Sequence, residues 1–163
     1  MRMTFNNFFK RPLKLLVLVA AAWAALAAQD KPLLTAAPPQ RIAASRNQTV
    51  EARVAVQVRS GYHANSNAPN EDYLIPLRLK WEGGPLTAVE VIYPKPEEKS
   101  YPFATKPVSV FTGAFEVVTR FKVDAAAPAG PGVLLGKLRY QACSEDTCYR
   151  PATVEIRLPY EIR

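Results

Sequence analysis

A strict alternation of apolar and polar residues constrains the fold of this chain more than any other feature. The clearest run is TVEARVAVQVR at residues 49–59, where every second residue from Val50 to Val58 is Val or Ala. Successive side chains of a β-strand point to opposite faces, so a period of two predicts a strand with one buried face. An amphipathic helix needs a period near 3.6, and the chain after residue 28 shows no such pattern.

Six further segments carry the same alternation or a short apolar run, with Gly and Pro turns between most of them. They cover residues 77–81, 87–93, 108–111, 115–123, 134–142 and 154–158. About seven strands of this kind predict an all-β fold, an immunoglobulin-like antiparallel β-sandwich, with an up-and-down barrel as the alternative. The polar segment 61–72 and the segment 94–107, which holds four prolines, are predicted to be loops.

The first 28 residues resemble an export signal. A basic, acid-free start is followed by an apolar stretch of 14 residues, Leu15 to Ala28, which is shorter than the ~20 residues that a membrane span needs. Small residues at Ala25 and Ala27 suit cleavage next to Ala28. We therefore expect residues 1–28 to be a cleaved signal peptide and the protein to be periplasmic or otherwise exported. An uncleaved N-terminal anchor is the alternative.

The rest of the chain is predicted to be a linker at 29–47, rich in Ala and Pro, which could end in a short edge strand, and one domain at 48–163. Four of the 21 Lys and Arg residues lie in the export signal, which leaves 17 basic residues against 14 acidic ones. These charges are interspersed, whereas a nucleic-acid-binding protein needs a concentrated basic face. We expect no nucleic-acid partner.

The two cysteines, Cys143 and Cys148, are separated by four residues in RYQACSEDTC. A connection of that length suits a β-hairpin, which would place the two Cα atoms ~4.5 Å apart at a non-hydrogen-bonded pair. An oxidising compartment allows a disulfide between them. Closing so short a loop is worth only about 2 kcal/mol. The residues alone therefore leave open whether such a bond is structural or redox-active.

Strand parity conflicts with a regular hairpin. Cys143 has the parity of Arg139, which is on the predicted solvent face, whereas Cys148 has the parity of Val154, which is on the predicted core face. Two cysteines that pair across one hairpin must share a face. We therefore predict a bulge or break near Pro151 that resets the phase.

Other cysteine chemistries are poorly supported. His63 is the only histidine, so a zinc site would have at most three Cys and His ligands at unusual spacing, and a Cys–His nucleophile lacks any orienting context. We expect no metal and no bound cofactor. Glu145 and Asp146 lie between the cysteines and disfavour a thiolate. A redox-active pair would therefore exchange electrons within a docked complex.

Four sequence blocks occur in a characteristic order: GYHANSN at 61–67, YLIP at 73–76, VIYP at 91–94 and LRYQACSEDTC at 138–148. Together they resemble the N-terminal periplasmic domain of DsbD-type thiol:disulfide interchange proteins, the "disulphide bond corrector" family, over roughly residues 40–160. The resemblance implies an immunoglobulin-like domain with thiol:disulfide interchange, or protein-disulfide reductase, activity. It implies electrons from a membrane thiol-electron transporter or a thioredoxin-fold protein. They would pass to periplasmic thiol proteins such as a disulfide isomerase or a thioredoxin of cytochrome c maturation.

The resemblance also implies roles for particular residues. The catalytic pair would be Cys143 and Cys148, with Cys148 forming the mixed disulfide. Segment 94–107 would be a cap loop that shields the pair through an aromatic side chain. The shielding residue would be Phe103 or Tyr101, and the neighbours of the pair would be Tyr62, His63 and Asn65.

This sequence departs from the family pattern in two ways. Four residues separate the cysteines, where better-known members have five. The chain also stops at Arg163, before any membrane or thioredoxin domain, so we expect a stand-alone monomer that receives electrons from separate proteins. The competing hypothesis is a non-catalytic immunoglobulin-like binding module with a structural hairpin disulfide.

Overall fold

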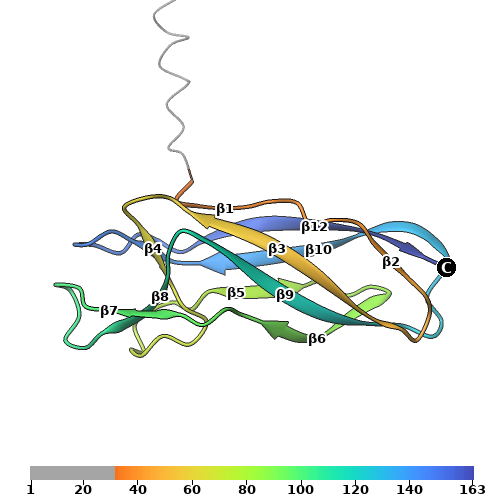
Figure 1. The fold of residues 1–163 in the computed structure, drawn as a ribbon, viewed down its shortest axis with the longest axis horizontal. Coiled ribbons are helices and arrows are strands. Elements are labelled where there is room, and N and C mark those ends of the chain that lie inside the picture. The colour runs from red at the N-terminus through yellow and green to blue at the C-terminus, as the bar shows by residue number, and fades with distance from the viewer. Residues whose placement is uncertain (1–31) are drawn as a thin grey trace, which may run out of the picture. The chain divides into compact units, whose positions relative to one another are not determined.

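Residues 32–163, the part of the chain that the computed structural model describes, form twelve β-strands and no helix (Figure 1). The strands are β1 (Leu34–Ala36), β2 (Ile42–Ala44), β3 (Thr49–Val58), β4 (His63–Asn65), β5 (Arg78–Trp81), β6 (Leu86–Ile92), β7 (Glu97–Lys99), β8 (Val108–Phe111), β9 (Ala114–Val123), β10 (Gly130–Tyr140), β11 (Ala142–Cys143) and β12 (Ala152–Ile162). All seven strands predicted from alternation are confirmed, as β3, β5, β6, β8, β9, β10 and β12.

The strands form three four-stranded sheets. The first sheet has the order β1-β3-β9-β6, the second β2-β12-β10-β5 and the third β11-β4-β8-β7. Every pairing is antiparallel except that of β12 with β2. In Figure 1, β3 and β9 cross in front of β10 and β12, while β4, β7 and β8 gather at one end. The predicted immunoglobulin-like sandwich is confirmed.

The apolar faces of the first and second sheets meet in the main core. Alternation along β3 and β9 buries the valines of the first sheet, and alternation along β10 and β12 buries the facing residues of the second. This is the pattern expected when two sheets each have one solvated face. Members of the main core include Val54, Val56, Val117, Phe121, Leu138, Ile156 and Leu158.

Four short strands, β1, β4, β7 and β11, were not predicted, whereas β2 matches the short edge strand allowed for at the end of segment 29–47. Strands β1 and β2 lie within 29–47, where the sequence predicted a linker, and the compact unit begins at Pro32. Strands β4 and β7 lie within the predicted loops, and β11 is split from the predicted strand 134–142 at Gln141. Segments of two or three residues cannot display an alternation, and β7 is an edge strand, which tolerates nearby prolines.

The N-terminal predictions fall outside the described part of the chain. The expected signal peptide at 1–28 and the alternative anchor both lie before residue 32. Between residues 32 and 163, no helix is long and apolar enough to cross a membrane.

Candidate functional site

The two cysteines form a disulfide at the mouth of a tight turn. Cys143 and Cys148 are antiparallel bridge partners with Cα atoms 3.9 Å apart, closer than the predicted ~4.5 Å. The amide of Ser144 donates to the Thr147 carbonyl at 2.8 Å, and the Ser144 hydroxyl accepts from the Thr147 amide at 3.2 Å. These bonds close the four-residue turn, so the predicted hairpin is confirmed.

The predicted phase break is present between the cysteines and β12. Cys143 lies opposite Cys148, and Tyr140 lies opposite Ala152. Two residues separate the pairs on the first arm and three on the second, so the second arm carries one extra residue around Pro151. An extra residue reverses the alternation, which allows both cysteines to share a face.

Strand β11 leaves the second sheet and pairs with β4 in the third. Cys143 lies opposite His63, and Ala142 lies opposite Ala64. Ala64 and Ala142 belong to the main core, so alternation places Cys143 and His63 on the other face of this ladder. Cys143 therefore keeps the outward parity predicted for it, yet its exposed fraction is 0%.

A small apolar cluster lies beneath the proline-rich loop and contacts the other cysteine, Cys148. Leu74, Val108 and Val110 form its buried centre, and Tyr101, Phe103 and Cys148 pack against it. We call this group the capped cluster. Because β7 occupies the middle of segment 94–107, we keep the name cap loop for the part after it, residues 100–107. The cap loop therefore lies against one half of the disulfide.

Three aromatic rings stack at the cap loop. The His63 and Tyr101 centroids are 4.1 Å apart with planes at 21°, and the Tyr101 and Phe103 centroids are 5.3 Å apart with planes at 10°. His63 thus links the strand that pairs with Cys143 to both aromatic residues predicted as shields. Sequence reasoning named all three residues but not their stacking.

His63 is held neutral in this stack. Its exposed fraction is 3%, and its Nε2 atom has no hydrogen-bond partner among the described residues. Burial, with a smaller contribution from the positive charge of Lys99, lowers the pKa of His63 from 6.5 to about 4. A charged imidazolium would lose hydration at this position, so the closed cap favours the neutral ring.

A glutamine side chain ties together the segments around the disulfide. The Gln141 Oε1 atom accepts from Asn65 Nδ2 and from the Ile75 amide, both at 3.0 Å, and Gln141 Nε2 donates to the Tyr149 carbonyl at 3.1 Å. We call this set the Gln141 clamp. It joins residues just before Cys143 and just after Cys148 to β4 and to the loop before β5.

Sequence reasoning found Asn65 but missed its partner in the Gln141 clamp. Gln141 shares the parity of Cys143 and lies two residues before it, which is the only sequence feature that could have pointed to it. Its hydrogen bonds join segments far apart in the chain, and no periodicity encodes them.

Tyr62 lies at the edge of the site rather than under the cap loop. Its ring is 5.8 Å from that of Tyr149, and the Arg59 guanidinium lies 5.6 Å from the Tyr62 centroid. Tyr149 directly follows Cys148 and is 41% exposed. A groove of about 640 Å³ opens beside these residues, and its lining includes His63 and Tyr101.

The two sulfur-bearing residues differ in their accessibility. Cys143 is fully buried, whereas Cys148 is partly exposed beside the exposed Tyr149. Among residues 32–163, no group of three or more His, Cys, Asp or Glu side chains is arranged to hold a metal ion. The structure therefore leaves one cysteine of the disulfide partly exposed and the other fully covered.

A family model described as thiol:disulfide interchange protein DsbD, N-terminal, matches residues 30–159. The chain belongs to this family. Membership confirms the resemblance found from the four sequence blocks, and it places the disulfide in a domain of thiol:disulfide interchange proteins. No curated protein matches the chain.

A solved structure supports the fold of this DsbD N-terminal family member. The N-terminal periplasmic domain of ScsB from Proteus mirabilis is 16% identical with a TM-score of 0.52, over 77% of this chain and 44% of that one. The chain thus spans less than half of that protein's solved length. A family 123 glycoside hydrolase from Clostridium perfringens also matches, at 16% identity and a TM-score of 0.30 over 76% of this chain and 22% of that one, a likeness too slight to bear on function.

Proposed function

We propose that this protein is a periplasmic thiol–disulfide exchange protein that passes reducing equivalents between partners through Cys143 and Cys148. The observation that carries the proposal is the disulfide itself, in a DsbD N-terminal family member, with one sulfur buried and the other beside an exposed edge. A six-residue loop adds only about 2 kcal/mol of stability, and the domain already has a large apolar core. Stability alone therefore explains this bond poorly.

The accessibility of the two cysteines supports a role for Cys148 as the attacked residue. A partner thiolate bonds to Cys148 Sγ, the Sγ–Sγ bond breaks, and Cys143 leaves as a thiolate that takes up a proton. The partner's second thiolate then attacks the partner sulfur that is bonded to Cys148 Sγ. Cys148 is released as a thiolate, which is protonated in turn. Two electrons and two protons have entered the domain, and the partner carries the disulfide.

Delivery follows the reverse sequence with a different partner. The Cys148 thiolate attacks an oxidised partner's disulfide, and the Cys143 thiolate resolves the mixed disulfide by attacking Cys148 Sγ. The partners would be thioredoxin-fold proteins, among them a disulfide isomerase or a thioredoxin of cytochrome c maturation, and a membrane thiol-electron transporter. Export through the predicted signal peptide would place the domain with them.

The cap loop would control access to the pair. Tyr101 and Phe103 pack against the cluster that contains Cys148, so the loop has to move before a partner sulfur can approach along the S–S axis. Its packing rests on few apolar contacts and on the ring stack with His63. A docking partner could therefore displace it at modest cost.

Redox titration tests the proposal against a purely structural disulfide. Oxidised protein is equilibrated with thioredoxin or glutathione buffers, and the thiol content is measured by alkylation. A working exchange protein titrates between about −180 and −270 mV, whereas a structural bond resists reduction to below about −300 mV. A potential in the second range would support the binding-module hypothesis instead.

Trapping tests the assigned roles. We expect Cys143→Ala, which leaves the reachable Cys148, to accumulate mixed disulfides with thioredoxin-fold proteins. Cys148→Ala leaves only the buried Cys143 and should trap at least about tenfold less, and a variant lacking both cysteines is the matched blank. Equal trapping by both single variants would remove the assignment of Cys148, and no trapping by either would remove the exchange function.

A further inference from the structure

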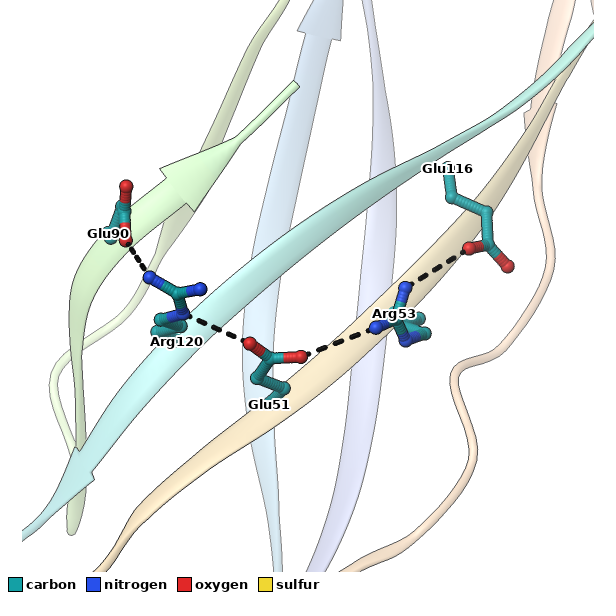
Figure 2. Close-up of polar contacts among 5 residues, drawn as sticks. All are labelled: Glu51, Arg53, Glu90, Glu116 and Arg120. Atoms are coloured by element: carbon teal, nitrogen blue, oxygen red, sulfur yellow. Dashed lines mark hydrogen bonds and ion pairs between the residues drawn. The ribbon is translucent and has the colours of Figure 1, made fainter. Parts of the chain in front are cut away.

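The outward face of the first sheet carries balanced charges. Glu51 on β3 lies opposite Arg120 on β9, which donates to Glu51 at 3.0 Å and to Glu90 on β6 at 2.8 Å (Figure 2). Arg53 continues the row, 3.3 Å from Glu51 and 3.6 Å from Glu116. Figure 2 shows these side chains as one chain of alternating sign across three strands. Opposite charges across strands are the favourable arrangement.

The outward face of the second sheet has the opposite character near its end at the disulfide. Arg78 on β5 lies directly opposite Arg139 on β10, and Lys80 lies opposite Lys137. On the other side of Arg139 is the neutral Thr153 of β12. Like charges placed directly across strands are destabilising, so this pairing is not explained by the stability of the sheet.

Little of this positive charge is neutralised locally. Lys137 pairs with Glu82 at 3.0 Å, and Glu155, which lies opposite Lys137, pairs with Arg157 at 3.2 Å. Within residues 32–163, no acidic group lies within ion-pair distance of the other three basic side chains, Arg78, Lys80 and Arg139. We call Arg78, Lys80, Lys137 and Arg139 the basic face.

The basic face is hollowed as well as charged. A groove of about 420 Å³ is lined by its four basic side chains together with Pro76, Trp81, Glu82 and Thr153. The methylene stems of the Lys and Arg side chains give such a groove apolar walls beneath a cationic rim. This combination suits carboxylate side chains on a protein surface, which can pair with an Arg fork while their methylenes pack below.

The basic face adjoins the disulfide. Arg139 lies four residues before Cys143, which corresponds to ~13 Å of extended strand. Ile75, whose amide donates to Gln141 Oε1 at 3.0 Å, lies three residues before Arg78. A standard interface covers about 800 Å² on each partner, so a protein bound at Cys148 would also extend over this face.

We propose that the basic face is a docking surface for an acidic protein surface on the thioredoxin-fold partner that exchanges electrons with Cys148. The inference rests on the proposed function and deepens it by assigning the charge of the partner. The acidic residues Glu145 and Asp146 at the tip of the hairpin are exposed, so the charge changes sign across the site. That sign change sets the orientation of a partner as well as its rate of encounter.

Charge reversal on the basic face tests the inference. The probe is a bacterial thioredoxin of net negative charge. Its reduced form is used to measure the rate of disulfide reduction by stopped flow, and a redox-inactive Cys-to-Ser form is used to measure binding. In low salt, Arg78→Glu with Arg139→Glu should lower the second-order rate about tenfold or more and weaken binding in parallel. The loss should shrink strongly near 1 M salt.

Matched variants separate docking from net charge and from folding. Arg53→Glu with Lys122→Glu makes the same charge change on the first sheet and should alter the rate less than about twofold. If charge reversal prevents folding, the milder double variant Arg78→Gln with Arg139→Gln takes its place. It should still slow reduction by thioredoxin about threefold. Reduction by dithiothreitol, which needs no docking, should be unchanged in every variant.

Each remaining outcome is decisive. An equal effect of both charge-reversal pairs would overturn the inference. The inference would also be overturned if Arg78→Glu with Arg139→Glu left the rate of reduction by thioredoxin unchanged but abolished binding to phosphatidylglycerol vesicles. The basic face would then bind membranes. If redox-inactive thioredoxin binds in a manner that needs the basic face, yet no thioredoxin reduces the wild-type disulfide, the docking surface stands and the proposed exchange function fails.

Discussion

The main core and the capped cluster are both buried, but they are built from different kinds of contact. The main core joins long alternating strands of two sheets and contains side chains such as Phe121 and Leu158. The capped cluster joins short strands and loops around Leu74 and two valines. On the cysteine face beside it lie His63 and Asn65, which hold the only two buried side-chain atoms in residues 32–163 without a hydrogen-bond partner.

This difference separates stability from reactivity. The unpartnered His63 Nε2 atom beneath Tyr101 raises the free energy of the closed state, typically by about 1–3 kcal/mol for such a buried polar atom, so the cap loop is held less firmly than the sheets. A region with few apolar contacts opens locally at a lower free energy than the whole domain unfolds. The disulfide thus lies where the fold can open without losing its main core.

The largest expected effect concerns the main core. Phe121→Ala removes a fully buried ring that packs edge-on against Trp81 at 5.2 Å, and we expect the free energy of unfolding to fall by about 3–5 kcal/mol. Urea denaturation measures this loss. The rate of disulfide reduction by dithiothreitol should stay within about twofold of wild type, and a large rate change would show that the two regions are not separate.

The second prediction concerns acidification of the capped cluster. The pKa of His63 is 6.5 in the unfolded chain and about 4 in the folded one, so the unfolded chain binds more protons between these values. The free energy of unfolding therefore decreases as the pH falls from 6.5 towards 4, by about 2 kcal/mol between pH 7 and pH 5. Urea denaturation at each pH measures it.

The control for acidification is His63→Phe, which keeps an aromatic ring in the stack and removes its titration. Because His63 is the only histidine, the difference between the two stability curves isolates its contribution from that of the carboxyl groups. Parallel curves for wild type and His63→Phe between pH 7 and pH 5 would contradict the burial of a neutral imidazole.

The third prediction concerns the Gln141 clamp. Gln141→Leu keeps the side-chain volume roughly and removes the bonds to Asn65, Ile75 and Tyr149. In the oxidised protein the disulfide still holds the two arms, whereas in the reduced protein they separate more freely. We expect the exchange equilibrium with glutathione to shift towards the dithiol about tenfold, which corresponds to one lost hydrogen bond of about 1.4 kcal/mol.

The conservative control for the clamp is Gln141→Glu. A carboxylate still accepts from Asn65 and Ile75 but cannot donate to the Tyr149 carbonyl, so its shift should be intermediate. A shift in urea stability with no change in the glutathione equilibrium would mean that Gln141 supports the fold alone and does not position the thiols.

The same contrast explains how much could be predicted from the sequence. The strands of the main core are long enough for alternation to identify them, and the parity conflict between Cys143 and Cys148 correctly predicted an irregular residue near Pro151. The capped cluster depends on contacts between short segments, such as the pairing of Cys143 with His63. No local pattern encodes those contacts, so the resemblance supplied the residues and the structure supplied their arrangement.

The smallest expected effect concerns the cap loop. Phe103 is only partly buried, so Phe103→Ala should lower the free energy of unfolding by only about 1 kcal/mol. Weakening the closed cap by about 1 kcal/mol raises the open fraction roughly fivefold, and reduction of the disulfide by dithiothreitol should accelerate by about the same factor. The control is Tyr73→Ala, which removes an aromatic ring that is 59% exposed in the loop between β4 and β5. It should change neither the free energy of unfolding nor the rate of reduction by dithiothreitol. If Phe103→Ala destabilised the domain as much as Phe121→Ala, the cap loop would be part of the main core and could not open independently to expose Cys148.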